Sequence, residues 1–194
     1  VGLCDETDVQ AAIDAATAAQ KHWRLVDAKS RAARLHQLAN AIEQDVACNR
    51  EVARLMTLEM GKPFPEAMGE LANCAPIFRY YAEMARDDAG KVAGTTQIGS
   101  FQHVRYEPYG VSVHIMPFNF PILLMCWTVA ASLAAGNACI VKPAEATTLC
   151  TLKFMEHFTS LLPGLMSCVP GDAATAQLLV KSAQTHAVAF TGSV

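Results

Sequence analysis

The stretch HIMPFNFPILLMCWTVAASLAAGNACIVKPAE, residues 114–145, decides the fold class of this chain. It belongs to a longer run, residues 108–141, that contains no Asp, Glu, Lys or Arg. A membrane-spanning helix needs roughly 20 consecutive apolar residues, but prolines and Asn119 interrupt the front of this run and Gly136 interrupts the back. The longest helix-like piece, Ile122–Ala135, is too short to span a membrane. The run therefore predicts a buried strand, a buried helix and a second buried strand.

The composition is that of a globular protein. The chain has 194 residues, of which 52% are hydrophobic, and this length suits one domain, or one domain and part of another. The formal net charge of −3 gives no reason to expect binding to nucleic acid or to an anionic membrane. The N-terminal sequence VGLCDETDVQ lacks the basic residues that begin a signal peptide.

The cysteines indicate reduced thiols. There are seven, an odd number, and no two are spaced C-x-x-C, which argues against a disulfide framework or a zinc ribbon. Free thiols are typical of the cytosol, so we expect a cytoplasmic protein. The six histidines include no H-x-x-x-H pair, and we expect no metal site.

Hydrophobic periodicity predicts four helices in about the first ninety residues. A capping-box pattern, Thr7 with Gln10, begins the first helix, which ends near Trp23. Gly61, with a proline two residues later, ends the third. The predicted helices cover approximately residues 7–23, 28–46, 52–61 and 65–88.

The pattern changes in the second half of the chain. GKVAGTTQIGS, residues 90–100, is a link of small residues, and FQHVRYEPYG, residues 101–110, predicts a strand with one solvent-exposed face. From Val111 onward, short β-rich segments alternate with helical ones, which indicates an α/β fold: N-terminal helices followed by a doubly wound, parallel, Rossmann-like sheet. The predicted strands are residues 111–116, 138–141, 166–169 and 187–190, and the helices between them are 122–135, 147–161 and 173–182.

Unusual residues follow all four predicted strands. They are Pro117, Phe118 and Asn119; Lys142, Pro143 and Glu145; Gly171 and Asp172; and Thr191, Gly192 and Ser193. The carboxyl ends of parallel strands meet at one edge of the sheet, where ligands bind. We therefore predict a nucleotide site at this edge.

Each of these residue types has a chemical role available. Gly192 and Ser193 precede an expected helix N-terminus, where free N–H groups and a hydroxyl suit a phosphate. Glu145 can accept hydrogen bonds from ribose hydroxyls, and Lys142 can donate to them or neutralise a phosphate. Asn119 offers an uncharged NH2 donor that can stabilise an oxyanion. Simpler explanations exist as well: Thr-Gly-Ser and an Asn beside prolines are common in turns, and Lys-Pro can protect the edge of a sheet.

At these residues the sequence resembles the aldehyde dehydrogenase superfamily. IMPFNFP, residues 115–121, is similar to the family's P-W-N-F-P segment, with Phe118 in place of Trp. LAAGNACIVKPAEATT, residues 133–148, is similar to A-x-G-N-x-x-x-x-K-P-x-E-x-T, and AFTGSV, residues 189–194, to F-T-G-S. LEMGKPFPEAMGEL, residues 58–71, resembles L-E-x-G-K-P-x-x-E-A-x-x-E, and YEPYGV resembles x-E-P-x-G-V. MTLEMGKP and IMPFNFP also lean toward the succinate-semialdehyde branch.

The resemblance implies roles for individual residues. Asn119 matches the side-chain donor that holds the aldehyde oxygen. Lys142 and Glu145 match the residues that hold the adenosine ribose; NAD is expected over NADP because a carboxylate repels a 2′-phosphate. Ser193 matches the pyrophosphate contact. The other residues expected at the cofactor are Ile115, Met116, Pro117, Phe118, Pro143, Gly171, Thr191 and Gly192.

Two departures from the family pattern stand out. PGDAATAQ, residues 170–177, has Ala173 where the family has a second glycine. Family chains are also much longer, and their nucleophilic Cys and general-base Glu match no position here. Cys126 in a buried helix and Cys139 in a strand are poor replacements, because burial disfavours a thiolate. The expected divisions are a helical region of the cofactor domain (residues 1–98), a β-strand arm (99–110) and the first half of the NAD-binding domain (111–194), with the catalytic domain absent and the sheet incomplete.

By resemblance, the full enzyme oxidises an aldehyde, with a semialdehyde as one option, to a carboxylic acid through a Cys thiohemiacetal. We therefore expect the cofactor-binding part of an NAD(P)-dependent aldehyde dehydrogenase, inactive alone and homo-oligomeric at full length. The alternative is a non-catalytic dinucleotide-binding or assembly module of the same fold. An acyl-phosphate or acyl-CoA reductase fits Asn119 and Glu145 less well. The fourth strand would leave an exposed sheet edge, from which we expect self-association.

Overall fold

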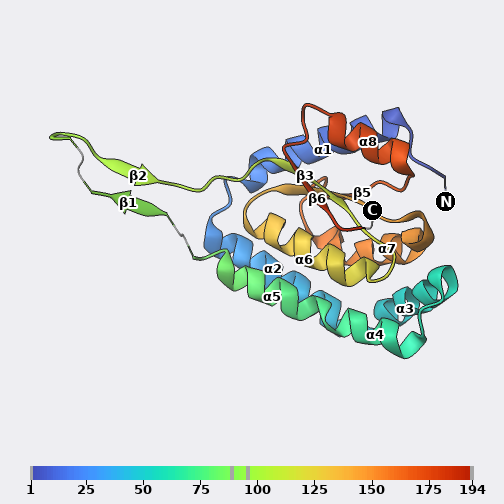
Figure 1. Ribbon diagram of the computed structural model, residues 1–194. Coiled ribbons are helices and arrows are strands. Elements are labelled where there is room, and N and C mark those ends of the chain that lie inside the picture. The colour runs from blue at the N-terminus through green and yellow to red at the C-terminus, as the bar shows by residue number, and fades with distance from the viewer. Residues whose placement is uncertain (1, 88–89, 95–96, 193–194) are drawn as a thin grey trace.

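A four-stranded parallel sheet lies between two layers of helices in the computed structural model, which describes residues 2–87, 90–94 and 97–192 (Figure 1). Helices α1 (Glu6–Trp23) and α8 (Ala173–Lys181) cover one face of the sheet, and α6 (Pro121–Ala134), with α7 (Thr148–Phe154) beside it, covers the other. A further layer packs outside α6 and α7: α2 (Ala28–Gln44), α3 (Val46–Met60), α4 (Phe64–Ala72) and α5 (Cys74–Met84). The predicted α/β class is confirmed.

The sheet contains all four predicted strands in the order β5-β4-β3-β6. They are β3 (Val111–Ile115), β4 (Ala138–Lys142), β5 (Met166–Cys168) and β6 (Ala187–Phe190), and every pairing is parallel. The two central strands are buried apart from the partly exposed Ile115. Helices on both faces of these strands explain why the sequence carries no charge from residue 108 to 141.

Helix α1 follows the predicted apolar spacing but begins earlier than predicted, and Val46, predicted to end the second helix, begins α3 and is exposed. Val9, Ile13 and Ala16 on α1 are buried. The expected cap at Thr7 is wrong: the Asp5 carboxylate accepts the N–H groups of Thr7 and Asp8, and the Asp8 carboxylate accepts the N–H of Asp5. A short carboxylate two or three residues ahead of free N–H groups satisfies them directly, so the box forms with Asp at both ends.

The helix predicted from residue 65 to 88 is two helices. α4 ends at Ala72 and α5 begins at Cys74; between them, the side-chain amide of Asn73 donates to the carbonyl of Gly69 at 2.8 Å. Pro76 explains the break, because a proline has no N–H and its ring clashes with the carbonyl four residues earlier. Gly61, at a φ of 80°, ends α3 as predicted.

A two-stranded arm extends from the body of the molecule (Figure 1). It pairs β1 (Lys91–Ala93) with β2 (Gln102–Val104) in antiparallel register. The prediction of a link over residues 90–100 missed β1, and the prediction of a half-buried strand over 101–110 was wrong, because β2 is three residues long and exposed on both faces. β1 has no buried face and no hydrophobic alternation from which to predict it. Residues 101–110 do alternate, but no other described element covers the apolar side chain of β2.

The helix predicted over residues 147–161 is also shorter. It begins with a 3₁₀ turn, η1 (Glu145–Thr147), continues as α7 and ends in a second 3₁₀ segment, η2 (Met155–Ser160). The sequence of η2 includes His157, Phe158 and Thr159, which are weaker helix formers than Leu or Lys. The Thr159 hydroxyl donates to the Glu156 carbonyl at 2.8 Å, which provides an alternative to the α-helical pattern.

A buried chain of polar side chains joins β3 to α6. His114, 2% exposed, bonds through Nε2 to the Ser112 hydroxyl and through Nδ1 to the Thr128 hydroxyl, both at 2.9 Å. A neutral imidazole has one donor and one acceptor, and hydroxyls can serve as either. Burial lowers the pKa of His114 to about 4.

Among the described residues, no helix has the length and apolar character needed to cross a membrane.

We predict that His114 makes the stability of the fold depend on pH. The unfolded imidazole takes up a proton near its ordinary pKa of about 6.5, whereas the folded one does so only near pH 4. Stability is therefore complete above pH 6.5 and falls as the pH drops toward 4; between pH 7 and pH 5 the loss is about 2 kcal/mol. Urea unfolding at both pH values measures it. His114→Leu should remove this part of the loss, and an unchanged difference between the two pH values would contradict the assignment.

Candidate functional site

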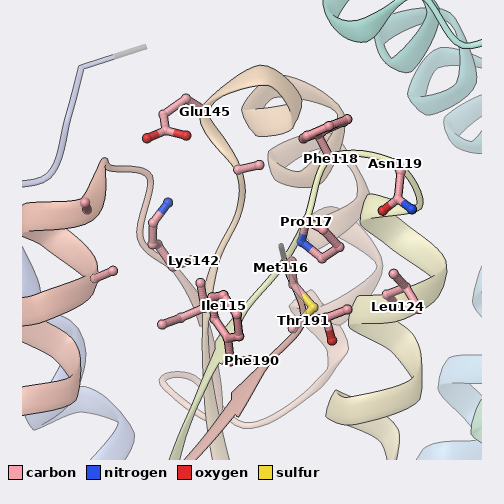
Figure 2. A pocket seen from close by; sticks show the side chains of 14 residues that line it. Ile115, Met116, Pro117, Phe118, Asn119, Leu124, Lys142, Glu145, Phe190 and Thr191 are labelled. Atoms are coloured by element: carbon pink, nitrogen blue, oxygen red, sulfur yellow. The ribbon is translucent and has the colours of Figure 1, made fainter. Parts of the chain in front are cut away.

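A cleft of about 550 Å³ opens at the carboxyl ends of the parallel strands (Figure 2). Its walls come from the segments after β3, β4 and β6 and from the first turns of α8. The lining residues are Ile115, Met116, Pro117, Phe118, Asn119, Leu124, Lys142, Ala144, Glu145, Ala173, Ala176, Phe190, Thr191 and Gly192. Most of the residues predicted for the site therefore share one cavity.

The strand order and register bring these segments together. The chain runs from β3 outward to β5, then returns to place β6 on the other side of β3. Ligands in such sheets bind where the strand order reverses, here between β3 and β6. Ile115 pairs with Lys142 on one side and with Phe190 on the other, so the three strands end at the same level.

Lys142 is held at the floor of the cleft by backbone carbonyls. The residue is 5% exposed, and its amine donates to the carbonyls of Pro143 at 2.7 Å and Gly171 at 2.6 Å. Burial lowers the pKa of Lys142, and the nearby carboxylates of Glu145 and Asp172 oppose that shift. An ammonium group has three N–H donors, so one more remains for a ligand. Figure 2 shows the amine directed toward Glu145, which is exposed.

Asn119 lies on the opposite side of the cleft from Lys142 (Figure 2). The segment before it is fixed by a hydrogen bond from the Met116 N–H to the Lys142 carbonyl at 3.0 Å. Its own side chain is exposed, as is the neighbouring Phe118 at 59%. Among the described residues, none forms a hydrogen bond with the Asn119 side chain, so its amide is available to a ligand.

Two predicted residues lie behind the cleft wall. Pro143 and Gly171 are buried and are absent from the lining, and their carbonyls hold the Lys142 amine instead. A Cβ on Gly171 would lie 2.1 Å from the Thr175 hydroxyl oxygen, so only glycine fits there. Pro143 and Gly171 thus hold the Lys142 amine in place without lining the cleft themselves.

The N-terminus of α8 is closed by its own side chain. The Asp172 carboxylate accepts the N–H groups of Ala174 at 2.8 Å and Thr175 at 3.2 Å. A carboxylate at this position occupies the donors that would bind an anionic group of a ligand. Ala173, where the family pattern has glycine, lines the cleft one residue later.

The end of β6 forms the remaining wall. Thr191 and Gly192 line the cleft, and the Thr191 N–H donates to the Ile115 carbonyl at 3.1 Å. Ser193, predicted as a phosphate contact, lies outside the described residues. Sequence reasoning did not include Leu124, Ala144, Ala176 and Phe190 in the site, although they line the cleft. The strand-end positions of Ala144 and Phe190 could have identified them, whereas Leu124 and Ala176 lie within helices and carry no such signal.

The seven cysteines, all of them described, lie away from the cleft lining. Burial raises the pKa of Cys139 to about 11 and that of Cys168 to about 12, and it raises the pKa of Cys126 as well. These thiols are protonated at neutral pH, and a protonated thiol is a poor nucleophile. The described residues therefore offer a cleft with hydrogen-bond donors and one exposed carboxylate, but no thiolate.

Two other features lie away from the cleft. A groove of about 440 Å³ on the far side of α6 is lined by aromatic residues, among them Tyr80 and Trp127. Asp45, Cys48 and His157 place potential metal ligands within 4.8 Å of one another. The Asp45 carboxylate caps the Cys48 N–H, and His157 bonds to Asn49, so these groups have protein partners and we assign no metal to them.

Comparison with known proteins gives the family. A sequence model of the Aldehyde dehydrogenase family matches residues 1–194. The chain belongs to the aldehyde dehydrogenase family. Retinaldehyde dehydrogenase 3 of Rattus norvegicus is 39% identical over 97% of this chain and 38% of its own length. Hydroxyisobutyraldehyde dehydrogenase of Mycolicibacterium austroafricanum is 34% identical over 97% and 37%. The resemblance inferred from the motifs is confirmed; the lean toward the succinate-semialdehyde branch finds no support in these relatives.

Solved structures agree with the fold. An aldehyde dehydrogenase from Bacillus cereus, in complex with NAD+, superposes with a TM-score of 0.91 at 31% identity, over 98% of this chain and 39% of that chain. An NADP-dependent enzyme from E. coli gives a TM-score of 0.90 at 31% identity, over 97% and 39%. The chain thus spans about two fifths of the length of the family members it matches.

Proposed function

We propose that this chain forms the cofactor-binding part of an NAD(P)-dependent aldehyde dehydrogenase. The observation that carries the proposal is the shared cleft: Asn119, Lys142 and Glu145, which come from two different strand ends, line one cavity at the point where the strand order reverses. An amide donor on one side and an amine with a carboxylate on the other suit a dinucleotide whose reactive end faces Asn119.

The cofactor end of the cleft suits an adenosine ribose. Glu145 is exposed and can accept hydrogen bonds from both ribose hydroxyls, while the buried Lys142 amine has a donor to spare. A 2′-phosphate would meet the Glu145 carboxylate, so we propose NAD as the preferred cofactor. Because Asp172 closes the N-terminus of α8, we place the pyrophosphate beside the Thr191–Gly192 turn.

Asn119 is proposed to act at the reacting carbonyl. When a thiolate attacks an aldehyde carbon, the carbonyl electrons move to oxygen, and the Asn119 NH2 group can donate to that oxyanion. NAD held by Lys142 and Glu145 would supply the acceptor for the hydride that leaves the same carbon. Water then hydrolyses the thioester, releasing the carboxylic acid and the thiol. The thiol and the general base must come from outside the described residues, since no described cysteine lines the cleft.

A second candidate function is a non-catalytic dinucleotide-binding or assembly module. It is favoured by the absence of a cysteine from the described lining of the cleft. The family also includes a protein named Omega-crystallin in Nototodarus sloanii, which is 35% identical over 97% of this chain. The native mass of the protein, and aldehyde oxidation by it, distinguish the two functions.

The free thiols agree with a cytoplasmic location, which we propose as well.

We predict that NAD stabilises the chain and that Glu145 determines its preference over NADP. A ligand at one hundred times its Kd stabilises by about 2.7 kcal/mol, which raises the Tm of a chain of this size by about 5–10 °C. Glu145→Ala should weaken NAD binding about tenfold, because the ribose loses a charged acceptor, and should bring the two cofactors closer in affinity. Glu156→Ala, an exposed carboxylate on η2, is the control and should change neither shift. A wild-type Tm that does not respond to NAD would refute the proposal.

We predict that Asn119 is needed for turnover and not for cofactor binding. In the protein expressed from its complete reading frame, Asn119→Ala should lower kcat for aldehyde oxidation about 100- to 1000-fold, the usual effect of losing one oxyanion donor. The NAD-induced rise in Tm should stay the same in that variant. A variant with wild-type kcat would show that the amide does not contact the reacting oxygen.

We propose that the chain also associates with copies of itself. Within the described residues, β6 pairs only with β3, and its Val188 and Phe190 side chains are 46% and 65% exposed. Such an edge can pair with another chain. Light scattering at rising protein concentration should give a mass above that of one chain, and Phe190→Lys should reduce it. A constant monomer mass would contradict this proposal.

A further inference from the structure

A buried ion pair lies directly behind the Asn119 loop, the segment of residues 116–120 that joins β3 to α6. Lys62 and Glu70, from the segment LEMGKPFPEAMGEL, are 6% and 3% exposed. Neither residue lines the cleft, and nothing in the proposed chemistry uses them. Charged side chains are rarely so buried unless they are paired and hydrogen-bonded, so the contacts of this pair need an explanation.

The Lys62 amine holds the backbone of Asn119. It pairs with the Glu70 carboxylate and donates to the Asn119 carbonyl at 2.8 Å. It also lies 3.7 Å from the centroid of the Phe120 ring, which gives it a favourable cation–π contact. Three groups on two segments thus converge on one ammonium, and two of them belong to the Asn119 loop.

The Glu70 carboxylate holds the start of the helix that follows this loop. Its Oε1 accepts the N–H groups of Ile122 and Leu123, both at 2.9 Å. These are free donors at the start of α6, and the residue at its cap position, Phe120, has no side-chain oxygen to accept them. Glu70 therefore supplies from α4 the cap that α6 lacks.

Asn119 is consequently fixed from both directions. On its N-terminal side, Met116 is bonded to Lys142; on its C-terminal side, the start of α6 is bonded to Glu70. Lys62 fixes its own carbonyl. The amide side chain, which has no recorded partner among the described residues, projects from this fixed backbone.

We propose that Lys62 and Glu70 are positioning residues that hold the Asn119 amide where the oxyanion of the substrate forms. This inference rests on the function proposed for Asn119. Stability alone is a weak explanation for the pair, because apolar residues of similar size are often as stabilising as a buried ion pair. A misplacement of about 1 Å at a reacting group can lower a rate about 100-fold, and a tethered backbone prevents it.

The test uses the double variant Lys62→Met/Glu70→Gln in the protein expressed from its complete reading frame. The glutamine would keep an oxygen acceptor for α6, the methionine would remove the donor to Asn119, and no charge would be left buried without a partner. We expect kcat to fall about 10- to 100-fold, with the NAD-induced change in Tm and the KM for NAD within about twofold of wild type. Asn49→Ala, a buried polar residue on α3 remote from the cleft, is the control for lost stability and should leave kcat unchanged.

A double-mutant cycle separates positioning from a general structural effect. If the pair acts through Asn119, the double variant should lower kcat no further in an Asn119→Ala background. Independent, additive losses in the two backgrounds would overturn the inference, as would wild-type kcat in the double variant. If the double variant does not fold, Lys62→Arg keeps the charge but displaces the donor, and it must show the same selective loss of kcat. A wild-type protein that binds NAD but oxidises no aldehyde would refute the proposed function instead, and the inference with it.

Discussion

The fold depends on carboxylates that satisfy the starts of two helices from a distance. Helices α6 and α7 follow the central strands directly, and neither has a side-chain cap of its own. Glu70 accepts two N–H groups of α6, and Glu59 accepts the N–H groups of Leu149 at 2.6 Å and Cys150 at 2.8 Å in α7. Free donors at a helix start are costly when buried without partners. The outer helices α3 and α4 are thus bonded to α6 and α7, the helices that cover this face of the sheet.

That arrangement explains why the cleft can be both open and well defined. Its walls are loops, which are mobile in most proteins, yet the loops after β3 and β4 lead to helices whose first turns are bonded to other elements. The floor is equally constrained, because the Lys142 amine connects the end of β4 to the segment before α8 through the Gly171 carbonyl. The exposed side chains of Glu145 and Asn119 therefore project from backbone segments that are held by hydrogen bonds.

Much of this could be predicted from the sequence, because the relevant signals are local. Charge-free strands, Gly61 after a helix and unusual residues after each strand all act within a few positions, and the parallel-sheet rule then brings the strand ends together. Lys62 and Glu70 could not be placed in this way. Their partners in and just after the Asn119 loop lie 57 and 52 residues away. In the sequence, Lys62 resembles a charge in an exposed turn, and Glu70 resembles a charge on the solvent-exposed face of a helix. The same holds for β1, whose exposed residues show no hydrophobic period. The helix break at Asn73 is different, because Pro76 is a local signal that could have predicted it.

The common level at which the three strands end has an evolutionary consequence. Side chains along a strand alternate between the two faces of the sheet. One residue inserted within Ala138–Lys142 would turn the lysine to the opposite face and separate its amine from the Gly171 carbonyl. Length changes should therefore accumulate among relatives in the β1–β2 arm and in surface loops, whereas the number of residues in each central strand should stay constant.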